Sequence, residues 1–200
     1  MRHFFTLLRH ELRALLISPG TYIAAILFLI VMGFVFQDFL TESINASRKH
    51  SPGAEFIRMF WLPVFFIVPL LTMKSIAEER HTGTLETLMT TPVTPIEIVL
   101  SKFTAAYFYY ISLWTMTLGF QVVLYYFAKD PNLIDPGPLI GGYSFIALSG
   151  FLFISIGIFS SSLTKNQLVA AILSFTMIFI IIIVGRNFSD WFHQNESQPL

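Results

Sequence analysis

The sequence predicts an all-α fold, a polytopic bundle of membrane-spanning helices that forms a single domain over residues 1–200. Two observations predict it. Of the 200 residues, 54% are hydrophobic and only 12% are charged, whereas soluble domains carry about 25% charged residues. In addition, long uncharged runs alternate with short charged segments, and a helix that crosses a bilayer needs about 20 mostly apolar residues. With a mean hydropathy of +0.69, the chain is expected to be a multi-pass membrane protein.

Uncharged runs in the sequence predict where the spans lie. Four runs are long enough by themselves to cross a bilayer, and apolar neighbours extend a fifth, shorter run. Arg58 and Lys74 lie near the ends of this fifth run, where long basic side chains can reach the membrane surface. The first run is too long for the hydrophobic region of a signal peptide, so a cleaved leader is disfavoured. We expect five spans, at about 20–37, 56–77, 98–127, 141–163 and 167–185.

Residues 1–17 precede the first span and have the pattern of an amphipathic helix. Apolar residues recur at helical spacing on one face, and basic residues gather on another. Ser18, Pro19 and Gly20 then mark a break before the first span. We expect a helix that lies along the membrane with its apolar face down, although a cytosolic extension of the first span is the alternative. The apolar face holds Phe5, Leu8, Leu12 and Leu15, and the basic face holds Arg9, His10 and Arg13.

Basic residues also predict the orientation. Arg2, Arg9 and Arg13 precede the first span, and the next basic residues after it are Arg48 and Lys49. By the positive-inside rule, the N-terminus is expected in the cytoplasm. The charged segment at 78–97 then also lies inside, and five spans leave the C-terminus outside.

The segment 78–97 is dense in helix-ending and helix-starting signals. The helix of the second span is expected to continue past the membrane surface through Glu78, Glu79 and Arg80 and to end at Gly83, because glycine is the usual helix terminator. A short helix should follow, with Thr84 as its N-cap, Glu86 in its first turn, and a stop at 91–92, where a proline follows a threonine. Its apolar face would consist of Leu85, Leu88 and Met89.

The third span begins with a capping box. Thr94 and Glu97 have the T-x-x-E spacing, and Pro95 occupies the first helical position. A helix over 95–127 would be about 50 Å long, while the hydrocarbon core is only about 30 Å thick. The third helix is therefore expected to begin in the cytosol.

Several classes of site are disfavoured by the sequence. The chain has no cysteine, which excludes disulfides, cysteine-ligated zinc and a cysteine nucleophile. Its five histidines are scattered with no H-E-x-x-H, so no metal site is expected, and no Gly-Lys pair could form a phosphate-binding loop. The net charge of zero disfavours nucleic acid. No polar cluster at one membrane depth suggests catalysis, so we expect neither catalytic residues nor a cofactor.

The stretch EERHTGTLETLMTTPVTPIEIVLSK closely resembles the coupling region of permeases of the second class of ABC-type exporters, the ABC-2 family. These permeases have an E-E-R-x-x-G-T-x-E pattern after the second span, followed by P-x-S/T-P-x-E and a lysine. Within this superfamily the chain looks most like gliding-motility-associated permeases, and less like those of nitrous-oxide-reductase maturation. The matching residues are Glu78, Glu79, Arg80, Gly83, Thr84, Glu86, Pro92, Thr94, Pro95, Glu97 and Lys102.

The resemblance implies a permease subunit of an ATP-driven exporter in the inner membrane of a bacterium. Such permeases work in the lipid membrane as pairs of identical or different subunits. Each subunit is bound by a separate cytosolic ABC ATPase. By this analogy, Leu85, Leu88 and Met89 would fill an apolar cleft on the ATPase. Polar contacts would come from Glu78, Glu79, Arg80 and Glu86.

Two alternatives accompany the resemblance. The chain could instead be a membrane anchor or scaffold of an ATPase-driven surface or motility machine that moves no solute. The absence of ionisable residues from the centres of the spans favours an export-type permease over an ion-coupled carrier. The family has six spans, so we expect truncation before a sixth, with residues 187–194 beginning a short re-entrant helix.

Overall fold

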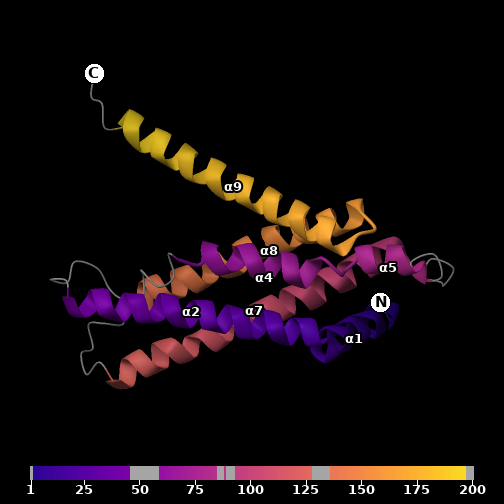
Figure 1. Cartoon of the computed structure of the whole chain (residues 1–200), viewed down its shortest axis with the longest axis horizontal. Helices are drawn as coiled ribbons and strands as arrows, with labels where there is room; N and C mark the ends of the chain where they lie inside the picture. The colour runs from indigo at the N-terminus through magenta and orange to yellow at the C-terminus, as the bar shows by residue number, and fades with distance from the viewer. Residues whose placement is uncertain (1, 46–58, 85–87, 89–92, 128–135, 197–200) are drawn as a thin grey trace.

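A computed structural model describes residues 2–45, 59–84, 88, 93–127 and 136–196 of the chain. Every regular element within these ranges is a helix, as the sequence predicts (Figure 1). The helices are α1 (Arg2–Ile17), α2 (Pro19–Asn45), α4 (Trp61–Thr72), α5 (Ala77–Thr82), α7 (Pro95–Phe127), α8 (Pro136–Leu163) and α9 (Gln167–Glu196).

Helix α4 lies at the centre of the bundle. It packs against α2, α7, α8 and α9, while α1 runs along α7. In Figure 1, α1 and α5 lie at the same end of the molecule, and α9 diverges from the other helices toward its C-terminal end. The charged segment and the N-terminal helix are therefore brought to one end of the bundle, although both α2 and α4 lie between them in sequence.

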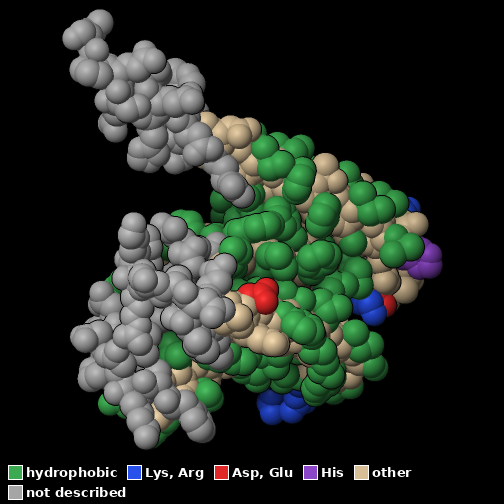
Figure 2. All heavy atoms as spheres, turned by 60° about the vertical axis from the view of Figure 1, so that its left-hand side comes forward, with side chains coloured by type: hydrophobic (Ala, Val, Ile, Leu, Met, Phe, Trp, Pro, Cys, Tyr) green, Lys and Arg blue, Asp and Glu red, His purple; other side chains and the backbone are tan. Residues whose placement is uncertain are grey.

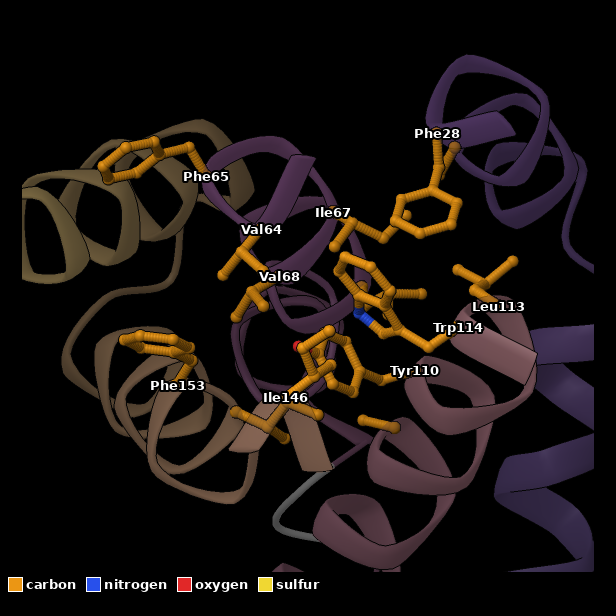
Figure 3. Packing of buried hydrophobic residues seen from close by; sticks show 14 of the residues in the cluster. Phe28, Val64, Phe65, Ile67, Val68, Tyr110, Leu113, Trp114, Ile146 and Phe153 are labelled. Carbon is orange, nitrogen blue, oxygen red and sulfur yellow. The ribbon is translucent and has the colours of Figure 1, made fainter. Parts of the chain in front are cut away.

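The core forms where α4 meets α7, α2 and α8 (Figure 3). Val64, Ile67 and Val68 of α4 are buried, and Ile67 lies beside the rings of Trp114 on α7 and Phe28 on α2. The ring of Phe28 on α2 meets Trp114 edge-on, with ring centroids 5.2 Å apart. Edge-to-face pairs of this kind contribute about 0.5–1.5 kcal/mol beyond the area that they bury. Aromatic packing thus holds three of the long helices together.

Four stretches among the described residues are long and apolar enough to cross a membrane: Pro19–Asp38, Trp61–Thr82, Gly137–Leu163 and Gln167–Gly185. These correspond to four of the five predicted spans. Large apolar side chains remain exposed over these helices, and Figure 2 shows a face dominated by hydrophobic side chains with few charged ones in view. Such a surface suits contact with lipid rather than water.

The predicted third span, α7, is not among those four stretches, because tyrosines, threonines and a glutamine dilute its apolar character. Several of its polar groups point into the bundle. Tyr107 Oη donates to the carbonyl of Ala147 on α8, and Tyr109 Oη donates to the carbonyl of Thr21 on α2, both at 3.0 Å. These bonds satisfy phenol groups that an apolar environment would otherwise penalise. A membrane span at α7 stays a prediction.

The second predicted span is not one continuous helix, contrary to expectation. Within the described part of 56–77, α4 ends at Thr72, a turn occupies 73–76, and α5 begins at Ala77. The helix was expected to run from the span through Arg80. The break occurs where a serine from α8 takes up backbone N–H groups that a continuous helix would have bonded internally.

Three other helices extend beyond the predicted spans: α2 reaches Asn45, α8 begins at Pro136, and α9 continues to Glu196. Pro136 and Pro138 are compatible with helix because both lie in the first turn of α8, where no N–H partner is needed. Residues 187–194 continue α9 and do not begin a re-entrant helix, since no proline or glycine interrupts the sequence there.

The predicted break after residue 17 is present: Ser18 separates α1 from α2, and Pro19 is the first residue of α2. The apolar face of α1 is divided. Leu8, Leu12 and Leu15 are half-buried, whereas Phe5 remains 66% exposed. Part of the face that we expected to rest on the membrane therefore packs within the protein, because α1 lies against α7 and α2.

Candidate functional site

The helix α5 ends at the glycine that the sequence singled out. Gly83 has φ +73, in the left-handed region that glycine adopts without the steric cost of a Cβ. Just before it, the hydroxyl of Thr82 donates to the carbonyl of Glu78 at 2.9 Å. The chain therefore turns after Thr82, within the candidate coupling segment at 78–97.

The start of α5 is fixed by a residue from another helix. Ser161 on α8 is fully buried, and its Oγ accepts the backbone N–H groups of Ile76 and Ala77, both at 3.0 Å. The same hydroxyl lies 3.2 Å from the carbonyl oxygen of Met73, to which it donates. One serine thus caps the helix start and closes the turn before it. The sequence does not predict this contact, because Ser161 lies more than 80 residues from Ile76 and Ala77 and has no local signature.

Arg80 is tied to the bundle. Its guanidinium donates to the backbone carbonyl of Ser162, near the C-terminal end of α8. A cation at a helix C-terminus is stabilised by the exposed carbonyls and the helix dipole. Since a guanidinium has five N–H donors, this bond leaves donors for a further partner. Arg80 therefore connects α5 to α8, a contact that the sequence did not predict.

Glu79 belongs to a buried ion cluster. The ammonium of Lys102, on α7, lies 2.6 Å from Glu79 Oε1 and 2.6 Å from Oε1 of Glu11 on α1. The side chain of Lys102 is only 3% exposed, and those of Glu11 and Glu79 are 17% and 24% exposed. Three helices, α1, α5 and α7, therefore meet at one ammonium group.

Glu11 and Lys102 were not among the residues that the sequence predicted to form this site. Two signals could have pointed to them. Glu11 is the sole carboxylate among the first 37 residues, in a segment otherwise basic and apolar, and Lys102 is the lysine that closes the coupling motif. What the sequence could not supply was their proximity, because 91 residues separate them.

A cavity of about 480 Å³ adjoins the ion cluster. It opens between α1, the start of α2, the end of α4, α5 and the start of α7. One part of its wall is charged and another is apolar, so the cavity is amphipathic. The charged or titratable lining residues are His10, Glu11, Lys74, Glu78, Glu79 and Lys102, and the apolar ones include Leu15, Leu70, Leu71 and Ala106.

The predicted short helix after Gly83 is described only in part. Thr84 and Leu88 have helical backbone, and Leu88 is half-buried. The hydroxyl of Thr84 lies 2.9 Å from the Thr82 hydroxyl and 3.4 Å from the Glu79 carbonyl, so it reaches back to α5. Leu85, Glu86 and Met89, together with the predicted stop at 91–92, lie outside the described residues.

Helix α7 begins with both hydrogen bonds of a capping box. The N–H of Glu97 donates to Thr94 Oγ1 at 3.3 Å, and the N–H of Thr94 donates to Glu97 Oε2 at 3.2 Å. Pro95 is the first helical residue, with its ring compatible with the first turn. The candidate segment at 78–97 therefore leaves α5 at a left-handed glycine and enters α7 at a reciprocal cap.

The charged groups here do not suggest a metal centre. Among the described residues, no three His, Asp or Glu side chains are placed to hold a metal ion. The carboxylates that do approach each other, Glu11 and Glu79, share a lysine. The local chemistry is that of a structural ion pair at a helix junction.

A comparison with family models identifies the chain. Residues 5–199 match the model of the ABC-2 family transporter proteins. The chain belongs to this family. As an ABC-2 protein it is a multi-pass membrane component of a transporter, the permease. Neither a curated protein nor a solved structure matches the chain.

In this ABC-2 permease, the residues of the coupling motif have two structural roles. Gly83, Thr94 and Glu97 shape the chain where it leaves α5 and enters α7. Glu79, Arg80 and Lys102 connect the segment to α1, α7 and α8.

Proposed function

We propose that this permease is the transmembrane subunit of an ATP-driven exporter, working with a separate cytosolic ABC ATPase and with a second permease half, identical or different. The protein would lie in the inner membrane of a bacterium, with α1 and the segment 78–97 on the cytoplasmic side. One observation carries the proposal: the motif-bearing segment is joined to the bundle by rigid connections at both ends, within a chain that belongs to the ABC-2 family.

These connections give a path for mechanical force. A displacement of the segment 78–97 would pull on α5, whose start is bonded to Ser161 on α8 and which turns directly into α4. At its other end the same displacement would act on the capped start of α7. Because packed helices shift between discrete arrangements rather than deforming continuously, movement at this end could reorient the spans.

Leu88 supports a docking role for the short helix. It is the one described residue of the predicted apolar face, and the predicted polar contacts Glu78, Glu79 and Arg80 lie on α5, just before it. Of these, Glu79 and Arg80 already have partners within the bundle. We therefore assign docking mainly to the residues after Gly83, and connection to the bundle to Glu79 and Arg80.

The likeness to gliding-motility-associated permeases rests on the sequence motif alone. The alternative function, as a membrane anchor of a motility or surface machine, depends on that likeness. Both functions require an ATPase partner, so they differ only in whether anything crosses the membrane.

Co-purification with the ATPases of the same cell tests the proposal. Wild type extracted in mild detergent should retain one ATP-binding subunit, identified by mass spectrometry. Leu88→Asp should lose it, because a carboxylate would be buried in an apolar cleft. Thr41→Asp, an exposed change on α2, is the matched control and should bind as wild type does. An unaltered elution profile on size exclusion must accompany each variant.

The result separates the alternatives. Absence of any ATPase from the wild-type sample, or equal binding by Leu88→Asp, contradicts the coupling proposal. If the ATPase is retained, the complex is reconstituted in vesicles that contain a fluorescent phosphatidylethanolamine. ATP-dependent movement of this probe across the bilayer supports the exporter, whereas the anchor predicts ATP hydrolysis without movement of it.

A further inference from the structure

The ion cluster around Lys102 joins two helices that are otherwise held by different parts of the bundle. Helix α1 packs along α7 and touches α2, whereas α5 packs on α8 and α9. The Lys102 ammonium, 2.6 Å from a carboxylate oxygen on each, is bonded to both. Without this ion cluster, α1 and α5 would each pack on different helices of the bundle.

The burial of Lys102 shows that this contact is not an ordinary surface ion pair. Exposed pairs are weak because water and salt screen them and because long side chains lose freedom on pairing. Here the lysine side chain is 3% exposed, in the second turn of a long, largely apolar helix. A buried ammonium is tolerated only where opposite charges and hydrogen bonds replace its hydration. Both carboxylates are therefore needed to hold the lysine in place.

Glu79 makes the cluster asymmetric. Its Oε1 contacts Lys102, while its Oε2 is buried and has no hydrogen-bond partner within the described part of the chain. Because that second oxygen is buried without a partner among the described residues, the ion pair at Oε1 is the contact that compensates the charge of Glu79. Removal of Lys102 would leave two carboxylates, on α1 and α5, facing each other across the vacated position.

We propose that Lys102 is a positioning residue that makes α1, α5 and the start of α7 one mechanical unit, so that the amphipathic N-terminal helix moves with the candidate coupling segment. The part of this inference that concerns ATP-driven movement rests on the proposed function. The physical link between the helices does not, and it can be tested on the permease alone.

The absence of cysteine makes the test clean, since spin labels attach only at introduced cysteines. One label pair joins α1 to α5, at Arg13→Cys and His81→Cys, both exposed. A second pair joins α1 to α7, at Arg13→Cys and Phe108→Cys, to report whether the rest of the fold is intact. Pulsed electron paramagnetic resonance then gives the distance distribution of each pair in detergent.

Three lysine variants decide the result. Lys102→Met keeps the length and apolar stem of the side chain but removes the charge, and it should widen the α1–α5 distribution at least twofold while leaving α1–α7 unchanged. Lys102→Arg keeps the charge and should restore most of the narrow distribution. Lys74→Met removes the other lysine of the same cavity and should have no effect.

The proposal is overturned if Lys102→Met leaves the α1–α5 distribution as narrow as in wild type, which would mean that packing without the ion cluster sets the spacing of α1 and α5. It is also overturned if both pairs widen together, because Lys102 would then hold the whole bundle rather than this junction. Neither measurement involves an ATPase, so failure here is distinct from failure of the coupling proposal. In a complex with the ATPase, ATP should shift the position of the label on α1 when Lys102 is present, and should not shift it in Lys102→Met.

Discussion

Gly157 on α8 faces Thr72 on α4 so closely that a Cβ at position 157 would stand 2.3 Å from Thr72 Oγ1 and 2.8 Å from Thr72 Cβ. One helical turn further along α8, Ser161 caps the start of α5. Small residues at these two positions let the end of α4 and the turn after it lie directly on α8. This contact places the candidate coupling segment relative to the spans.

The Gly157 contact predicts a steric effect on stability. Gly157→Ala should destabilise the protein by about 1–3 kcal/mol, the usual cost of overpacking a well-packed core. Thr72 cannot easily yield, because it is fully buried and its hydroxyl donates to the carbonyl of Val68 at 2.8 Å. Thermal unfolding in detergent, followed by tryptophan fluorescence, measures the change. Gly141→Ala, on the same helix, would place its Cβ more than 4 Å from the atoms of the described residues around it; it is the control and should be neutral or slightly stabilising. Equal midpoints for the two variants would refute the contact.

Ser161 offers a test of the helix cap. Ser161→Ala leaves the N–H groups of Ile76 and Ala77 without their acceptor, and an unsatisfied buried donor costs about 1–3 kcal/mol. Hydrogen–deuterium exchange should accelerate at 76–78, while the centre of α7 keeps its protection. Ser155→Ala is the matched control, since the Ser155 hydroxyl is exposed and bonds within its own helix to Phe151. Unchanged exchange at 76–78 in Ser161→Ala would show that the cap has no energetic role.

The capping box at the start of α7 should be worth about 1 kcal/mol locally. Thr94→Ala removes the acceptor for the Glu97 N–H, and we expect faster hydrogen exchange confined to the first turn of α7. Thr104→Ala, whose hydroxyl bonds to the Leu100 carbonyl inside the same helix, should leave that turn unchanged. Exchange that rises along the whole of α7 would contradict a local capping role.

Gly83 provides a test of the left-handed turn. Gly83→Ala forces a side chain into the left-handed region, at a cost of about 1–2 kcal/mol, and should weaken capture of the ATPase subunit. Gly83→Asn should be milder, because asparagine adopts this conformation more readily than alanine. No atom of the described residues lies within 4 Å of the added Cβ, so a clash with this part of the chain does not explain a loss. If alanine and asparagine behave alike, the backbone conformation at this position does not control docking.

Much of the local structure was determined by the sequence. Uncharged runs predicted the helical bundle and four of its candidate spans, since apolar composition and length decide what a bilayer accommodates. Short-range signals also placed single residues correctly: the helix end at Gly83, the break at Ser18 and the start of α7 at Pro95. These features depend on the backbone preferences of a few neighbouring residues, and the residue types in the sequence determine those preferences.

The tertiary structure alone decided which residues meet. The split of the second span into α4 and α5 depends on Ser161, and the ion cluster on Glu11, Glu79 and Lys102, all of them brought together from distant parts of the chain. Local patterns have no information on such contacts, because a buried hydrogen bond or ion pair is selected by the packing of whole helices. Residues predicted to face a partner, Glu79 and Arg80, therefore have bonds within the bundle, since burial at a helix junction leaves a charged group to be satisfied by whichever helix lies against it.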